Sequence, residues 1–267
     1  MLTEITLGQY FPGNSFIHRL DPRTKILATI IYIIAIFFAE TPVSYGILTA
    51  FAAGVILISR LPWLMVLKSL KPIWIIIFFT LLIHMFTAPG EHIIWTWKFL
   101  SVTQEGLDLG LKMAVRLVLL LLFSSVLTFT TSPIVLTDGI ENLLRPFKAV
   151  GVPAHELAMM MTIALRFIPT LLEETDKIMK AQQARGADFE SGNIIRRAKA
   201  LVPILIPLFI SAFRIAQELA LAMEARCYGC GVKRTRMNAM KLGRIDVFGS
   251  IVFVFFLAAI VLERIFL

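Results

Sequence analysis

Two short stretches place an arginine directly after an alanine, Ala184-Arg185-Gly186 and Ala225-Arg226-Cys227. Each closes a long stretch of helical pattern and is followed by polar sequence containing glycine. A guanidinium is a planar fork of N–H donors that can bind a carboxylate through two parallel hydrogen bonds. A lone arginine at a helix end would be explained by its interaction with the helix dipole, worth less than about 1 kcal/mol at an exposed site. Because the pattern occurs twice, we expect both arginines to bind acidic sites on a partner.

Catalytic groups are sought first among the histidines. His155-Glu156 begins like the zinc-binding pattern HExxH, but Met159 stands where the second histidine ligand is needed. His84, late in an apolar stretch, fits a core or interface residue better than a catalyst. The sequence contains neither a GxSxG nucleophile motif nor a glycine-rich phosphate loop. We therefore expect a chain that is not an enzyme and that needs no cofactor.

The two cysteines, Cys227 and Cys230, form one CxxC pair. A structural zinc site needs four ligands, and the sequence has no second pair. A redox-active CxxC normally follows a thioredoxin-like pattern, which is also missing. Two small residues in a loop or at a helix end are the simpler interpretation, and we expect no metal site.

The composition shows which elements must position these arginines. The 267 residues are 58% hydrophobic and 16% charged, with a mean hydropathy of +0.81, whereas soluble domains average about 25% charged residues. One soluble core could not bury so much apolar surface. The fold class expected is an all-α integral membrane protein with about five transmembrane helices and long cytoplasmic coupling helices.

Five apolar stretches are expected to cross the membrane. The fourth must begin near Leu107 to reach the roughly 20 residues that a crossing needs, so it includes Asp108, Lys112 and Arg116 on one helix face. Charges at such depth are functional candidates, but an ion-paired stripe near the interface explains them equally well. The predicted spans are Ile26–Ala39, Val43–Ser59, Ile73–Ala88, 107–129 and Val247–Leu262.

The region 131–246 has a different pattern, with charges spread throughout it. Three helices are predicted here: one from Ser132-Pro133 to about Arg145-Pro146, one from Pro153 to Ala184, and one from about Asn193 to Arg226. The prolines inside the last of these, and the arginines that flank its apolar part, argue against a sixth crossing. We expect this helix to be buried against other helices or to lie in the membrane interface.

The distribution of basic residues predicts the orientation. Lysine and arginine gather in the N-terminus, the 60–72 loop and the 131–246 region, so the positive-inside rule places these on the cytoplasmic side. The predicted organisation is an N-terminal cytoplasmic segment with four spans over 1–130, a coupling-helix region over 131–246, and a last span over 247–267. The C-terminus would then lie outside a multi-pass protein of the cell membrane.

Three stretches give the chain a resemblance to a known family. They are Ser15 to Lys25 (SFIHRLDPRTK), Ala184 to Phe189 (ARGADF) and Met223 to Gly229 (MEARCYG). In this order and on this topology, the chain resembles the transmembrane T component, EcfT, of energy-coupling factor transporters. Cys227 stands where glycine is common in that family, which leaves the arginine in place but alters the residue that caps the helix.

The resemblance implies a coupling subunit without enzymatic activity. Ala184, Arg185 and Gly186, and likewise Ala225, Arg226 and Cys227, would dock into two ABC-type ATPases that carry out the ATP hydrolysis. The same helices would support a membrane-embedded substrate-binding S component that captures a vitamin or a metal ion. No nucleic-acid partner is implied, and the identity of the transported substrate would be set by a different chain.

The residues also suggest a contact surface for the S component. Met159, Met160 and Met161, together with Leu205 and Phe209 in the next helix, form an adaptable apolar surface, because methionine repacks easily against different partners. Ordinary packing between the two long helices explains the same residues equally well. The alternative function is a secondary transporter with a regulatory cytoplasmic helical domain, but such proteins usually show paired halves and charged residues near the membrane midplane.

Overall fold

The computed structural model describes residues 10–87, 92–97, 100–187, 189, 194–228, 240 and 242–266. The chain divides into two compact units. The larger unit comprises Gly8–Ala154 and Met240–Leu267, and the smaller unit comprises His155–Ala239 with Met1–Leu7. Each unit is considered by itself.

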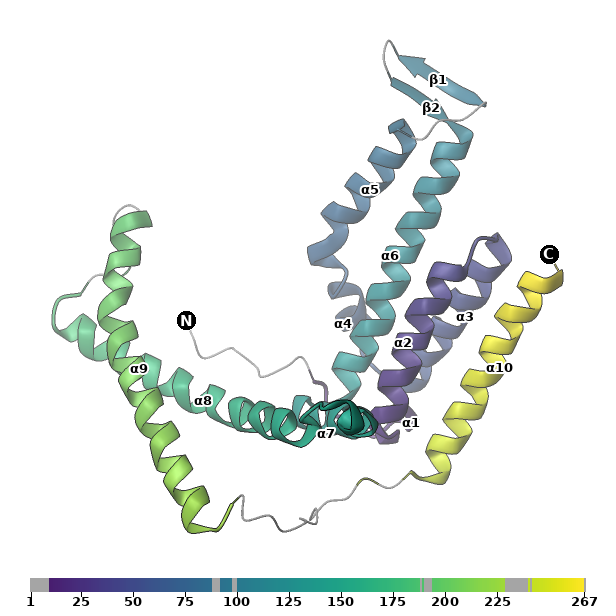
Figure 1. Cartoon of the computed structure of the whole chain (residues 1–267). Coiled ribbons are helices and arrows are strands. Elements are labelled where there is room, and N and C mark those ends of the chain that lie inside the picture. The colour runs from purple at the N-terminus through teal and green to yellow at the C-terminus, as the bar shows by residue number, and fades with distance from the viewer. Residues whose placement is uncertain are drawn as a thin grey trace. The chain divides into compact units, whose positions relative to one another are not determined.

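The larger unit is a bundle of membrane-length helices joined by short elements (Figure 1). Its long helices are α2 (Pro22–Phe38), α3 (Pro42–Ser59), α5 (Trp74–Thr87), α6 (Gln104–Thr130) and α10 (Arg244–Phe266). Its short elements are α1 (Phe16–Arg19), α4 (Trp63–Lys68), the 3₁₀ turn η1 (Lys71–Ile73), β1 (Ile93–Trp97), β2 (Leu100–Thr103), α7 (Pro133–Leu144) and the 3₁₀ turn η2 (Arg145–Val150).

Helix starts in this unit follow the capping chemistry of the sequence. The Asp21 carboxylate accepts a hydrogen bond from the backbone N–H of Arg23 at 2.9 Å, and Pro22 takes the first helical position of α2. Proline is tolerated there because the first helical N–H groups have no partner within the helix. Ser132 and Pro133 begin α7 in the same way, which confirms the predicted start of that helix.

The segment between the third and fourth spans contains more structure than expected. The predicted spans leave it as a plain connection, but β1 and β2 pair as an antiparallel hairpin, with an irregularity in register between Ile93 and Trp95. Thr103 then caps α6, accepting the N–H of Gly106 at 3.1 Å. The fold is otherwise helical, and α6 begins at Gln104, three residues before the predicted start.

Small residues allow α5 and α6 to pack closely. A side chain at Gly106 would lie 3.0 Å from the backbone oxygen of His84, and one at Gly110 would lie 3.2 Å from that of Leu81. Residues four apart share one helix face, so these glycines and Ala114 line the contact with α5. This small-residue spacing is typical of transmembrane helix pairs, in which close backbone approach replaces hydrophobic burial as the source of attraction.

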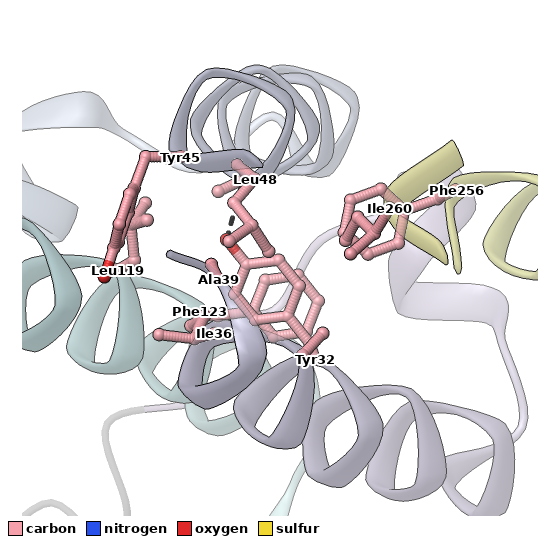
Figure 2. Close-up of a cluster of buried hydrophobic side chains, with 11 residues drawn as sticks. Tyr32, Ile36, Ala39, Tyr45, Leu48, Leu119, Phe123, Phe256 and Ile260 are labelled. Atoms are coloured by element: carbon pink, nitrogen blue, oxygen red, sulfur yellow. Dashed lines mark hydrogen bonds between the residues drawn. The ribbon is translucent and has the colours of Figure 1, made fainter. Parts of the chain in front are cut away.

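The core of the larger unit is an aromatic cluster between α2, α3, α6 and α10 (Figure 2). Tyr32 is fully buried, stacks on Phe123 with ring centroids 3.9 Å apart, and donates its hydroxyl hydrogen to the backbone oxygen of Leu48 at 3.0 Å. Phe51 and Phe256 form a second stacked pair at 4.0 Å. A buried tyrosine with its hydroxyl satisfied contributes both packing and helix registration.

A buried polar cluster joins the helix ends on the N-terminal side of this bundle. The Lys25 ammonium donates to the backbone oxygens of His18 and Thr130, at 3.3 and 3.0 Å, and to the hydroxyl of Thr131 at 3.2 Å. The Asp246 carboxylate accepts the backbone N–H of Asp21 at 2.6 Å. These bonds fix the start of α2 to the end of α6 and the start of α10.

Arg116 has a structural role in the predicted charged stripe of α6. Its guanidinium donates to the Ala39 backbone oxygen at 3.3 Å and to the Tyr45 hydroxyl at 3.1 Å, and it lies 5.4 Å from the centre of the Phe37 ring. The bonds satisfy the turn between α2 and α3. Of the two interpretations of the stripe, the contacts of Arg116 favour the structural one.

The smaller unit contains two long helices, α8 (Ala154–Ala184) and α9 (Ile194–Ala225), as the sequence predicted. They meet where the Ser211 hydroxyl donates to the Glu174 carboxylate at 3.4 Å, and again where the Tyr228 hydroxyl donates to the Met159 sulfur at 2.6 Å. Figure 1 shows the two helices crossing at an angle instead of lying parallel. Both are continuous through internal prolines.

Six helical stretches of the described chain are long and apolar enough to cross a membrane. They are α3, α4 with α5, α6, α8, Lys199–Ala225 of α9, and α10. The expected set had five spans: it included α2, which at 17 residues is at the short end of the membrane-crossing range, and it assigned α8 and α9 to the cytoplasm. The all-α membrane fold is confirmed, with about six membrane-competent helices.

Candidate functional site

The first arginine motif closes α8. The backbone N–H of Ala187 donates to the Gln182 oxygen at 3.0 Å, and that of Gly186 donates to the Gln183 oxygen at 2.9 Å. These two bonds define a Schellman motif, which satisfies the last carbonyl groups of a helix. Gly186 has a φ of +88°, the left-handed conformation that this motif requires at its turning residue. The predicted role of Gly186 as the helix cap is confirmed.

The second motif closes α9 with the same bonds. The N–H of Tyr228 donates to the Met223 oxygen at 2.9 Å, and that of Cys227 donates to the Glu224 oxygen at 2.8 Å. Cys227 has a φ of +56° and so takes the conformation that Gly186 takes in α8. A side chain in this region costs roughly 1–2 kcal/mol. The cysteine therefore preserves the cap geometry, at a local cost that glycine would avoid.

Both caps leave their arginines in the same local position. Arg185 and Arg226 directly precede the left-handed residue, and both are exposed. Neither forms an ion pair with a described acidic residue, whereas Lys177 and Lys180 of α8 pair with Glu174 and Asp176 on their own helix. Two exposed guanidinium groups thus lie at the ends of long helices, and a guanidinium can bind a carboxylate through two parallel hydrogen bonds.

The predicted apolar contact residues are mostly exposed. Met160, Met161, Leu205 and Phe209 expose between 44% and 62% of their surface. This argues against the simpler interpretation, in which they pack between α8 and α9. Met159 is the exception, because it is half-buried and its sulfur accepts a hydrogen bond from the Tyr228 hydroxyl. The types and the spacing of these two residues did not predict this contact. It couples the second arginine motif to the methionine cluster.

Several other residues singled out in the sequence do not add to this site. Asp188 of the first motif and Cys230 of the CxxC pair lie outside the described residues. Within the described residues, no three histidine, cysteine or acidic side chains are grouped as a metal site would require. The described site is therefore made of arginine donors and apolar contact surface, a composition typical of recognition.

Known proteins match this chain over most of its length. The family model described as CbiQ, cobalt transport protein, matches residues 13–237. A protein of Acidaminococcus fermentans is 66% identical over 94% of both chains, and one of Ruminiclostridium cellulolyticum is 56% identical over 98% of both. A protein of Bacillus subtilis is 48% identical, covering 90% of this chain and 91% of its own. All three are energy-coupling factor transporter transmembrane proteins EcfT.

The chain belongs to the EcfT family. The matched region contains both arginine motifs and the whole N-terminal stretch from Ser15 to Lys25 that carried the resemblance. EcfT proteins are membrane components of transporters, in agreement with the apolar helices described above. The chain is thus a multi-pass membrane protein of a transport system, as the sequence predicted.

Proposed function

We propose that this chain is the coupling subunit of an importer of the energy-coupling factor type. It transmits the ATP-driven motion of two cytoplasmic ATPases to a substrate-binding S component, which takes up a vitamin or another micronutrient. The observation that carries the proposal is the duplicated helix end: two exposed arginines, each held before a left-handed cap by the same pair of backbone bonds. Two equivalent anchors suit two related motor subunits.

The arginines act as docking groups in this mechanism. Each lies at the end of a helix whose last carbonyls are already satisfied by the Schellman bonds, so its guanidinium is not needed to cap the helix. A carboxylate on the ATPase can accept two parallel hydrogen bonds from the guanidinium, which fixes both distance and direction. Lysine would keep the charge but lose that planar fork. Closing of the two ATPases would then pull on the two helix ends together.

The length of the helices converts this pull into motion elsewhere. A helix of 31 residues, such as α8, is about 46 Å long, so a displacement at Ala184 is carried to the methionines near its other end. The Ser211–Glu174 hydrogen bond joins α8 to α9 between their ends. We propose that the exposed residues Met160, Met161, Leu205 and Phe209, with the half-buried Met159 beside them, contact the S component. Exposed apolar surface of this extent needs a partner or lipid to cover it.

Copurification tests the docking proposal. The double variant Arg185→Glu, Arg226→Glu reverses both charges while leaving the caps intact, so it should abolish copurification of the ATPase subunits with the chain. Arg214→Glu is the matched control, since Arg214 is also exposed on α9 but lies away from the helix end. ATPase subunits retained by the double variant in the same yield as by the control would rule out the docking role.

Uptake assays test the apolar surface separately. Met160→Asn and Phe209→Asn should reduce uptake while ATPase copurification persists, because polar side chains at these positions weaken apolar contact with the S component. Leu221→Asn is a suitable control, being as exposed on α9 as Phe209. Uptake unchanged by the substitutions at Met160 and Phe209 would show that the S component binds elsewhere.

The secondary-transporter alternative predicts a different outcome. Such a protein would transport without ATPase subunits and would retain activity when both arginines are reversed. The family assignment favours the importer component, since the related chains are components of energy-coupling factor transporters. Uptake by the purified chain alone in vesicles, without ATPase subunits, would support the secondary-transporter alternative.

A further inference from the structure

The larger unit contains a cavity that the coupling mechanism does not use. It has a volume of about 1020 Å³ and lies between α2, α3 and α10, with α6 behind it. The core rings Phe51 and Phe123 form part of its wall, so it adjoins the aromatic cluster of Figure 2. A cavity of this size is large enough for an extended organic ligand.

The walls of the cavity are apolar and reach the bundle surface. Leu27 of α2, Ile58 of α3, and Phe248 and Val252 of α10 line it and are themselves exposed. These residues lie in helices of a membrane protein, so the surface that the cavity reaches is surrounded by lipid chains and not by water. An apolar space open to the bilayer suits an acyl chain.

One end of the cavity is lined by cationic side chains, next to the buried carboxylates of Asp21 and Asp246. Arg23, in the first turn of α2, lines it with 27% of its side chain exposed. Its Nε is buried and donates no hydrogen bond among the described residues, although it lies 3.8 Å from the Asp21 carboxylate. Lys25 also lines the cavity, but its ammonium already donates to three oxygens. Arg23 is therefore the better placed of the two to bind a further anion.

We propose that this cavity binds one phospholipid with an anionic headgroup. One acyl chain lies along Leu27, Ile58 and Phe253, and the phosphate is held by the guanidinium of Arg23 at the end of α2. Basic pockets between transmembrane helices bind anionic lipid headgroups in this way, because the charge lies at headgroup depth and the chain at hydrocarbon depth. The bound lipid would fill the gap between α10 and the α2–α3 pair.

The glycines of α3 offer a matched test of the acyl-chain position. Gly54 lines the cavity whereas Gly46 does not, and a side chain begun at either would meet no atom within 4 Å. Gly54→Leu therefore places an apolar side chain inside the cavity, starting from an open position, and Gly46→Leu adds the same side chain elsewhere on the helix. Native mass spectrometry of the full chain in detergent, titrated with phosphatidylglycerol, should show one tightly held lipid in wild type and in Gly46→Leu. Gly54→Leu should lose it.

The headgroup position is tested with the same titration. Arg23→Gln should weaken phosphatidylglycerol binding about tenfold, the loss expected for one charged hydrogen bond, and Lys68→Gln, an exposed lysine of α4, should not. Wild type should hold phosphatidylglycerol more tightly than phosphatidylcholine or oleate. Retention of the lipid by Gly54→Leu, or its loss from both glycine variants, would overturn the cavity assignment. Equal binding of all three lipids would overturn the role of Arg23.

Discussion

The two units of this chain bury their apolar residues to very different extents. In the most apolar segment of α6, which belongs to the larger unit, 33% of the residues are buried. In the most apolar segments of α8 and α9, 6% are buried. Tyr32, Ile36 and Leu48 are fully buried in the larger unit. In the smaller unit, Ala158 and Ile204 are the buried apolar residues among those described. Buried apolar contacts stabilise the larger unit, whereas the smaller unit leaves most of its apolar side chains exposed.

This difference in burial separates residues that should affect stability from exposed residues that should affect binding. Buried hydrogen bonds and stacked rings in the larger unit fix helix positions, so substitutions there should act on stability. Arg185, Arg226, Met160 and Met161 of the smaller unit are exposed, so substitutions there should act on binding and leave the isolated chain folded. Each prediction below tests that division, beginning with the largest effect.

The strongest contrast is between two aromatic truncations. Tyr32→Ala removes a ring stacked on Phe123 and the hydroxyl bonded to Leu48, and should destabilise the chain by about 3–5 kcal/mol. Phe209→Ala, at a side chain that is 62% exposed, should change the stability of the chain alone by less than about 0.5 kcal/mol. Chemical denaturation in detergent measures both. Equal losses would show that the smaller unit is internally stabilised too.

A carboxylate in each unit gives the next contrast. Asp246→Ala leaves the backbone N–H groups of Asp21 and Gly243 without the oxygens that now lie at 2.6 and 2.7 Å. It should cost about 2 kcal/mol, and Asp246→Asn, which keeps one acceptor oxygen, should cost less. Glu218→Ala on the exposed surface of α9 should be neutral. The same denaturation series checks all three, and a neutral Asp246→Ala would contradict the role of the buried cluster.

Substitutions at the two left-handed residues, Gly186 and Cys227, test the backbone strain at each arginine helix end. Cys227→Gly relieves the left-handed strain and should strengthen the end of α9 by about 1 kcal/mol. Gly186→Ala introduces the same strain and should weaken the end of α8 by a similar amount. Hydrogen exchange at the amides of Tyr228 and Ala187, which close the two motifs, measures the local opening. Cys227→Ala keeps a side chain and should change little; slower exchange in that variant would assign the effect to the thiol instead.

The smallest effect is a pH dependence in the larger unit. Burial lowers the pKa of His18 below its ordinary value of 6.5, and the hydrogen bond from its Nε2 to the Phe11 oxygen opposes that shift only in part. The unfolded chain then binds more protons than the folded chain as the pH falls. The contribution of His18 to stability should be constant well above pH 6.5 and should decline below it.

Thermal unfolding across this pH range checks the dependence. His18→Asn removes the titrating group, so the part of the decline that starts near the ordinary histidine pKa should disappear in that variant. If the wild-type protein instead became more stable on acidification, relative to His18→Asn, the sign of the pH dependence would be reversed and the burial argument contradicted.

Local chemistry made much of the fold predictable. The starts of α2 and α7 follow from a capping side chain before a proline, and the end of α8 follows from Gly186, because each of these signals acts within a few residues. The β1–β2 hairpin was missed although its isoleucine, tryptophan and threonine residues favour strands, because tryptophans beside an apolar span also fit the membrane interface. The partners of Lys25, at Thr130 and Thr131, lie more than 100 residues away and could not be read from spacing.

The candidate site was predictable in its residues but not in its geometry. The repeated Ala-Arg pair gave the positions of Arg185 and Arg226. That Cys227 would adopt the conformation of a glycine could not be predicted, because residue preference argues against it and the helix end imposes it. The contact of Tyr228 with Met159 is likewise a consequence of how α8 and α9 cross.

The central claim is that two arginine helix ends hold two ATPase subunits. The most direct measurement is the mass of the intact complex isolated from membranes, for wild type, for each single arginine-to-glutamate variant and for the double variant. The account predicts two ATPase subunits per chain in wild type, weakened complexes in Arg185→Glu and Arg226→Glu, and none in the double variant. Two ATPase subunits still bound to the double variant would contradict it.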